Sequence, residues 1–172
     1  MDTNHPSQKY GNKMRLVLFQ PDIPQNLGSA IRLSACLGVE LDIIEPCGFP
    51  LSDKAVKRTA MDYGDAARVT RHDSWAKFTA WRDQTSQGSR VILFTTKSAQ
   101  PYCDFAFTLD DILLMGRESA GVPDEVHAYA DARLFIPMQP GMRSINVINS
   151  AAMALGEALR QTQGFAKANA DT

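Results

Sequence analysis

The chain has 172 residues, of which 44% are hydrophobic and 22% are charged, and its formal net charge is −1 at pH 7. This length allows one domain with a sizeable core and is short for two, and the near-neutral charge does not indicate a polyanionic partner for the chain as a whole. The apolar runs are far shorter than the roughly 20 residues that cross a bilayer, and the N-terminus lacks a signal-peptide core, so we expect a protein of the cytoplasm. We predict a flexible extension over residues 1–13, one domain over 14–162 and a flexible tail over 163–172.

In chain order, short and nearly continuous apolar runs alternate with segments of helical pattern. Continuous apolar character indicates strands buried on both faces of a sheet. The predicted strands are 15–19, 41–45, 90–95, 112–116 and 133–137, with 67–71 as a weaker candidate. The predicted helices run from an Asn26 cap to Leu37, from a Ser52 cap to Ala60, from an Asp73 or Ser74 cap to Asp83, partly over Glu118–Ala130, and from a Ser144 cap to Gln161.

This order predicts an α/β fold, an open and mostly parallel sheet with helices on both faces. In the last helix, Ile145, Ile148, Ala152, Leu155 and Leu159 form one apolar stripe. Ligands of open parallel sheets bind beyond the carboxyl ends of the strands, so the loops that follow the strands are the expected site.

Common enzyme signatures are missing from the sequence, including the phosphate-binding glycine loops, the G-x-S-x-G elbow and H-E-x-x-H. The three histidines are scattered, so no metal site is expected, and the three cysteines lack metal-ligand spacing and are interpreted as buried free thiols. The loops instead offer backbone amides, small residues and arginines. Such a site suits a cofactor that brings its own reactivity.

Polar residues at the starts of two predicted helices are candidates for function. Arg32 can reach back to the turn at Gly28, although a structural salt bridge is the alternative. Asn26 either only caps its helix or also faces a ligand. Arg143 and Asn149 flank the start of the last helix, and this asparagine either binds a ligand or ties loop to helix.

A basic cluster lies between residues 53 and 72. It is interpreted either as a solvated helix face or as a phosphate-contacting patch, because its first three members fall at helical spacing. Its candidate residues are Lys54, Lys57, Arg58 and Arg71.

Three ordered segments together resemble the motifs of SPOUT-superfamily RNA methyltransferases. They are "LFQPDIPQNLGSAIRLSACLGVELDIIEPCGF", "LLMGRESAGVP" and "IPMQPGMRSINVINSAAMALGEALRQ". The chain is most similar to the minimal, single-domain tRNA (cytidine(34)-2′-O)-methyltransferase family, which "IIEPCGF" and "DYGDAARVTRH" favour over larger ribose methyltransferases.

The resemblance implies a C-terminal deep trefoil knot, a homodimer and S-adenosylmethionine (AdoMet) bound in the knot. It implies methyl transfer to the ribose 2′-hydroxyl of the wobble nucleotide, a cytidine or modified uridine, in the anticodon stem-loop of tRNA. Arg32 would orient the acceptor, with Asn26, Arg143 and Asn149 on the acceptor side. The implied cofactor residues are Phe94, Thr95, Gly116, Glu118, Ile136, Met138 and Ser144.

Two departures from the family pattern stand out. Gly156 occupies a position where relatives often have tyrosine, and Arg117 follows the glycine where many have proline. The alternatives are a SPOUT enzyme acting on another tRNA or rRNA nucleotide, and a non-catalytic AdoMet- or RNA-binding module.

Overall fold

A single six-stranded parallel sheet forms the centre of the computed structural model, which describes residues 13–63 and 66–166, without the side chains of 57 and 59–61. The strand order is β3-β2-β1-β5-β4-β6, and all pairs are parallel. The predicted α/β class and sheet are therefore confirmed. The strands are β1 (Arg15–Phe19), β2 (Glu40–Ile44), β3 (Val69–His72), β4 (Val91–Phe94), β5 (Ile112–Met115) and β6 (Ala132–Leu134).

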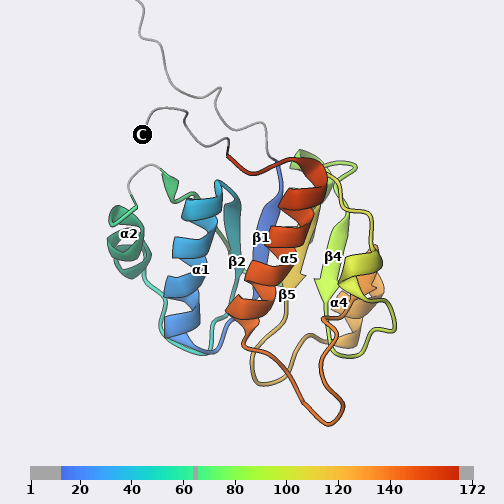
Figure 1. The fold of residues 1–172 in the computed structure, drawn as a ribbon. Helices are drawn as coiled ribbons and strands as arrows, with labels where there is room; N and C mark the ends of the chain where they lie inside the picture. The colour runs from blue at the N-terminus through green and yellow to red at the C-terminus, as the bar shows by residue number, and fades with distance from the viewer. Residues whose placement is uncertain (1–12, 64–65, 167–172) are drawn as a thin grey trace, which may run out of the picture.

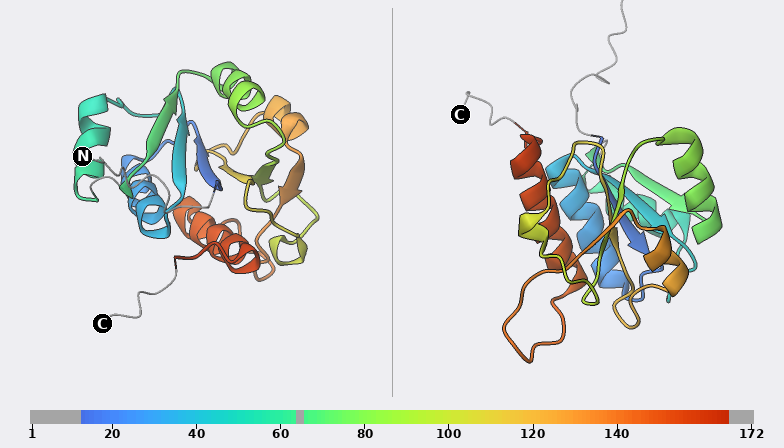
Figure 2. Two further views of the ribbon diagram at one scale, coloured as in Figure 1. Left: turned by 90° about the horizontal axis from the view of Figure 1, so that it is seen from above. Right: turned by 90° about the vertical axis from the view of Figure 1, so that its right-hand side faces the viewer.

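Helices cover both faces of this sheet (Figures 1 and 2). One face carries α1 and α5, with α2 at its edge, and the other carries α3 and α4. Within the described residues, no helix is long and apolar enough to cross a membrane. The helices are α1 (Pro24–Leu37), α2 (Asp53–Met61), α3 (Trp75–Thr85), α4 (Asp124–Tyr129) and α5 (Val147–Thr162), with a short 3-10 helix, η2 (Tyr102–Asp104).

The two layers explain why the strands are apolar at every position. In β5, Leu113 and Met115 pack into the core beneath α1 and α5, while Ile112 and Leu114 pack into the core on the α3 side. Alternate side chains of a strand point to opposite faces, so a strand covered on both sides needs apolar residues throughout.

Several predicted helix and strand limits were wrong. Helix α1 begins at Pro24 with Ile23 as its N-cap, so Asn26 lies inside the helix. Proline is favoured at a first helical position because its missing N–H has no partner there anyway. The segment 118–123 is not helical, and β6 ends at Leu134. Gly38, Ser52 and Ser74 end or cap their helices as predicted.

Two predictions about burial also need correction. Ala152 is only half-buried, and the buried face of α5 contains Ala151, Ala154 and Ala158 beside its leucines. All three cysteines are free, but Cys36 and Cys103 are exposed and Cys47 is half-buried. The predicted extension lies outside the described residues except for Lys13, and the predicted tail is described only over residues 163–166.

A charged cluster is buried in the α3 layer. Asp42 is fully buried, and it accepts from Arg15 Nε at 2.5 Å and faces His72 Nε2 at 2.8 Å. The guanidinium of Arg15 also lies 4.7 Å from the ring centroid of Trp81 and pairs with Glu40. The cluster joins β1, β2 and β3 to α3.

Candidate functional site

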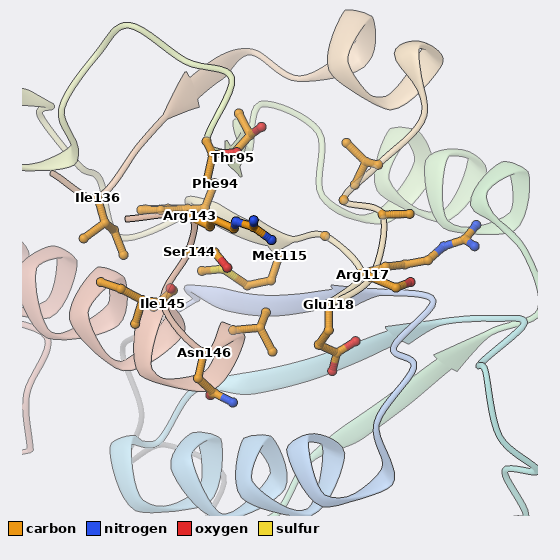
Figure 3. Close-up of a pocket in the computed structure, with 18 of the residues that line it drawn as sticks. Phe94, Thr95, Met115, Arg117, Glu118, Ile136, Arg143, Ser144, Ile145 and Asn146 are labelled. Carbon is orange, nitrogen blue, oxygen red and sulfur yellow. The ribbon is translucent and has the colours of Figure 1, made fainter. Parts of the chain in front are cut away.

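A cavity of about 450 Å³ opens beyond the carboxyl ends of β4 and β5 (Figure 3). Its walls come from the loops after β4, β5 and β6, from α4, and from the starts of α1 and α5. This is the edge at which open parallel sheets bind ligands. The lining residues include Phe94, Thr95, Lys97, Met115, Gly116, Glu118, Val122, His127, Ile136, Met138, Ser144 and Asn146.

The loop after β5 closes tightly on itself. Arg117 and Gly121 exchange backbone hydrogen bonds of 2.9 and 3.0 Å, and Gly121 has a φ of +65°. A Cβ placed on Gly116 would lie 2.9 Å from the backbone of Gly121. Glycine is therefore required at 116 by close approach of the backbone and at 121 by the left-handed conformation.

A chain of hydrogen bonds ties three loops together at the pocket. Glu118 accepts from Asn26 Nδ2 and from the backbone N–H of Asp22, both at 2.8 Å. Asn26 Oδ1 in turn accepts from Asn146 Nδ2 at 3.2 Å. Asn26 is only 8% exposed, so its amide needs these partners.

Asn146 also caps α5. Its Oδ1 accepts from the backbone N–H groups of Ile148 at 2.9 Å and Asn149 at 3.2 Å. The predicted cap, Ser144, is wrong; it lies two residues before the cap, exposed and on the pocket wall. Serine and asparagine both suit an N-cap, so their residue types could not decide between them.

All seven predicted cofactor residues line the cavity, as do Asn26 and Arg143. Figure 3 shows the Arg143 side chain reaching across the pocket, whereas Arg117 points away from it. Arg117 instead donates to Gln20 and lies 5.6 Å from the ring centroid of Phe19. Lys97 and His127 were missed, because neither belongs to a recognised motif.

Two predicted acceptor-side residues lie outside this cavity. Asn149 is exposed on the first turn of α5. Arg32 is exposed on α1, where its Nε donates to the hydroxyl of Tyr63. The predicted salt-bridge alternative for Arg32 has no support among the described residues, since a tyrosine holds it.

The basic cluster divides into two kinds of residue. Lys54 and Arg58 are exposed on α2, and the side chain of Lys57 lies outside the described residues. Arg71 pairs with Glu45 at 2.8 Å and with Asp53 at 2.5 Å. Its charge is therefore already matched within the chain, which leaves less of it for a phosphate. Among the residues described, no group of three or more side chains could hold a metal ion.

The thiol of Cys47 lies near the carboxylates of Glu45, Asp22 and Glu118. Burial, followed by the negative charge of Glu45, raises the pKa of its thiol to about 11. Only the thiolate attacks alkylating reagents. We expect iodoacetamide at pH 8 to label exposed Cys103 well before Cys47, as measured by peptide mass mapping over time. Equal rates at the two cysteines would contradict this.

Residues 13–156 match the model of the SpoU rRNA methylase family. The chain belongs to that family. The match spans β1 through most of α5, and so includes every wall of the cavity described above.

Several known proteins are similar to this chain in sequence or in fold. The tRNA (cytidine(34)-2′-O)-methyltransferase of Beijerinckia indica is 60% identical over 152 residues, covering 88% of this chain and 94% of that protein. A solved structure concerned with 2-OH methylation of C/U34 on tRNA is 39% identical, with a TM-score of 0.77, covering 87% of this chain and 96% of that one. The SpoU methyltransferase AviRb from Streptomyces viridochromogenes, solved with AdoMet, is 26% identical, with a TM-score of 0.74, covering 94% of this chain and 66% of that one.

Proposed function

We propose that this SpoU-family chain is a tRNA (cytidine(34)-2′-O)-methyltransferase, which methylates the ribose 2′-hydroxyl of the wobble nucleotide. The observation that carries the proposal is the 60% identity to an enzyme of that name across 88% of the chain. The chain also matches 94% of the length of that relative, but only 66% of AviRb.

The cavity fits AdoMet as the methyl donor. Its volume of about 450 Å³ suits a ligand of that size, and Phe94, Met115 and Ile136 give it apolar walls for an adenine. Gly116 lets the loop after β5 close tightly on itself at the cavity wall, because a Cβ at this position would meet the backbone of Gly121 at 2.9 Å. AdoMet has no phosphates, which agrees with the absence of a phosphate-binding glycine loop.

When bound, AdoMet supplies a methyl group already activated on its sulfonium. The protein then has to align the acceptor and accommodate the loss of its proton. The bonds from Asn146 through Asn26 to Glu118 fix the loops around the cavity. Arg143 brings a positive charge to the pocket. Arg32 orients the RNA backbone and stabilises negative charge there, because an arginine is too basic to act as a free base.

The knot, the homodimer and the cytoplasmic location remain part of this proposal. After β6, at the edge of the sheet, the chain passes beside the loops that follow β4 and β5, and all three segments line the cavity. It then enters α5, which packs against α1. This path supports a knot. Exposed Ile23 and Met153, which a second copy would cover, support the homodimer. The anticodon stem-loop of tRNA is the proposed substrate site, and the cytoplasm is where tRNA would be met.

The decisive experiment maps the methyl group. Purified protein, AdoMet and tRNA from a strain lacking the gene are incubated, and the tRNA is digested and analysed by mass spectrometry. We expect a new methyl group on the ribose of nucleotide 34. A methyl group on another tRNA nucleotide, or none on tRNA, would leave the family membership intact and overturn the proposed substrate. Calorimetry that shows no AdoMet binding would overturn the proposed enzymatic activity.

Replacing Arg32 with alanine tests the acceptor side. We expect kcat/KM for tRNA to fall roughly ten- to 100-fold, the range for hydrogen bonds to a charged group. The AdoMet Kd should stay unchanged, because Arg32 lies outside the cavity. Steady-state kinetics and calorimetry measure the two quantities, and near-wild-type turnover would remove Arg32 from the mechanism.

A further inference from the structure

Arg32 differs from other arginines of the chain in what holds it. Several arginines bond to carboxylates, among them Arg15, Arg71, Arg82, Arg90 and Arg160. Arg117 bonds instead to the side chain of Gln20, and Arg133 to the backbone carbonyl of His127. In the described part of the chain, Arg32 has no carboxylate partner, and Tyr63 holds it instead. A tyrosine hydroxyl fixes a guanidinium without neutralising its charge.

The contact occupies only one edge of the guanidinium. Nε donates to the Tyr63 hydroxyl, and Cζ lies 5.7 Å from the ring centroid, within the range of a cation–π interaction. Neither terminal amino group of Arg32 has a hydrogen-bond partner among the described residues, and the side chain is exposed. The guanidinium is therefore held at Nε, and its two terminal amino groups stay exposed and positively charged.

We propose that Tyr63 is a positioning residue for Arg32 and holds its two free amino groups ready for the phosphate–ribose backbone of the RNA substrate. The forked donors of arginine match two oxygens of a phosphate, and fixing the fork in advance lowers the entropy lost on binding. The bond also links two segments, since Arg32 lies in α1 and Tyr63, 31 residues later, follows the end of α2. The proposal rests on the function proposed above.

A second arginine–tyrosine pair provides a matched control. The guanidinium of Arg82 lies 5.6 Å from the Tyr129 ring centroid and donates to its hydroxyl at 3.4 Å. That guanidinium is saturated, however, because it also bonds to Asp83, Asp131 and the carbonyl of Ser89. Tyr129 therefore has the same chemistry in a purely structural setting.

The test uses three variants, Tyr63→Phe, Arg32→Ala and the double variant that carries both changes. Tyr129→Phe is the control. Because Tyr63→Phe keeps the ring and loses one hydrogen bond, we expect kcat/KM for tRNA to fall roughly three- to tenfold. Its AdoMet Kd and melting temperature should match those of Tyr129→Phe, whose kcat/KM stays at the wild-type value. In the Arg32→Ala background, Tyr63→Phe should cause no further loss, since coupled residues are not additive.

Three results would overturn the proposal: unchanged kcat/KM in Tyr63→Phe, a full further loss in the Arg32→Ala background, or a loss that follows AdoMet affinity or melting temperature. Filter binding of tRNA to the same variants separates this proposal from the function itself. If the wild-type protein binds tRNA but does not methylate nucleotide 34, the proposed function fails. Weaker tRNA binding by Tyr63→Phe would still support the positioning role, and unchanged binding would end it.

Discussion

Replacing Asp42 with alanine is expected to lower the free energy of unfolding by about 3–5 kcal/mol, the cost of removing one partner from a buried ion pair. Asp42 is fully buried, and the side chain of Arg15, to which it bonds, is only 13% exposed. Without the carboxylate, this guanidinium and the ring of His72 lose their shared acceptor inside the α3 layer. Urea unfolding followed by circular dichroism measures the difference.

Asp83→Ala is the matched control for that substitution. Asp83 pairs with Arg82 at 3.3 Å, but its side chain is 61% exposed. Exposed pairs contribute about 1 kcal/mol or less, so this variant should unfold almost like the wild type. Equal losses from the two substitutions would show that burial does not determine the strength of the Asp42 cluster.

Gly116→Ala is expected to weaken AdoMet binding. The new Cβ would meet the backbone of Gly121 at 2.9 Å, and backbone cannot rotate out of the way as a flexible side chain can. Overpacking of this kind costs about 1–3 kcal/mol, which corresponds to roughly five- to 150-fold in Kd if the loop after β5 shifts into the cavity. Isothermal titration calorimetry with AdoMet gives the Kd directly.

Gly156→Ala serves as the control glycine. It lies inside α5, and no atom lies within 4 Å of an added Cβ. The variant should bind AdoMet as tightly as the wild type and gain about 0.5–1 kcal/mol of stability from the better helix former. A Gly116→Ala protein with a Kd within twofold of this control would refute the packing argument.

The sequence predicted the layers of the fold well, because both faces of the sheet are covered and the strands are therefore apolar at every position. Seven residues that the family motifs predicted as cofactor contacts all line one cavity. The helix starts were harder. Asn26 and Ser144 have good capping side chains, yet Asn26 bonds to Glu118, 92 residues away, and Asn146 caps α5 instead. The bonds of Asn26 to Glu118 and Asn146 join residues far apart in the sequence, and the residues around Asn26 give no sign of them.

The place of Arg32 could not be predicted for a related reason. The sequence predicted that its side chain returns to the turn near Gly28, within its own helix. The structure pairs it with Tyr63, whose position depends on how α2 and the following segment pack beside α1. Lys97 and His127 reach the cavity in the same way, because β4 lies beside β5 in the sheet and α4 packs on one face of it (Figure 2), and not because of any motif.

The hydrogen bonds from Asn146 through Asn26 to Glu118 also determine when, during synthesis of the polypeptide, the cofactor cavity can form. The three residues lie near the beginning, in the last third and close to the end of the domain. Strand β1 likewise waits for β5, about 97 positions later, before it has neighbours on both sides. When only the first two thirds of this protein has been synthesised, five of the six strands are present, but Glu118 and Asn146 are not. The cavity therefore cannot be completed, and AdoMet cannot stabilise the fold by binding, until synthesis is nearly finished.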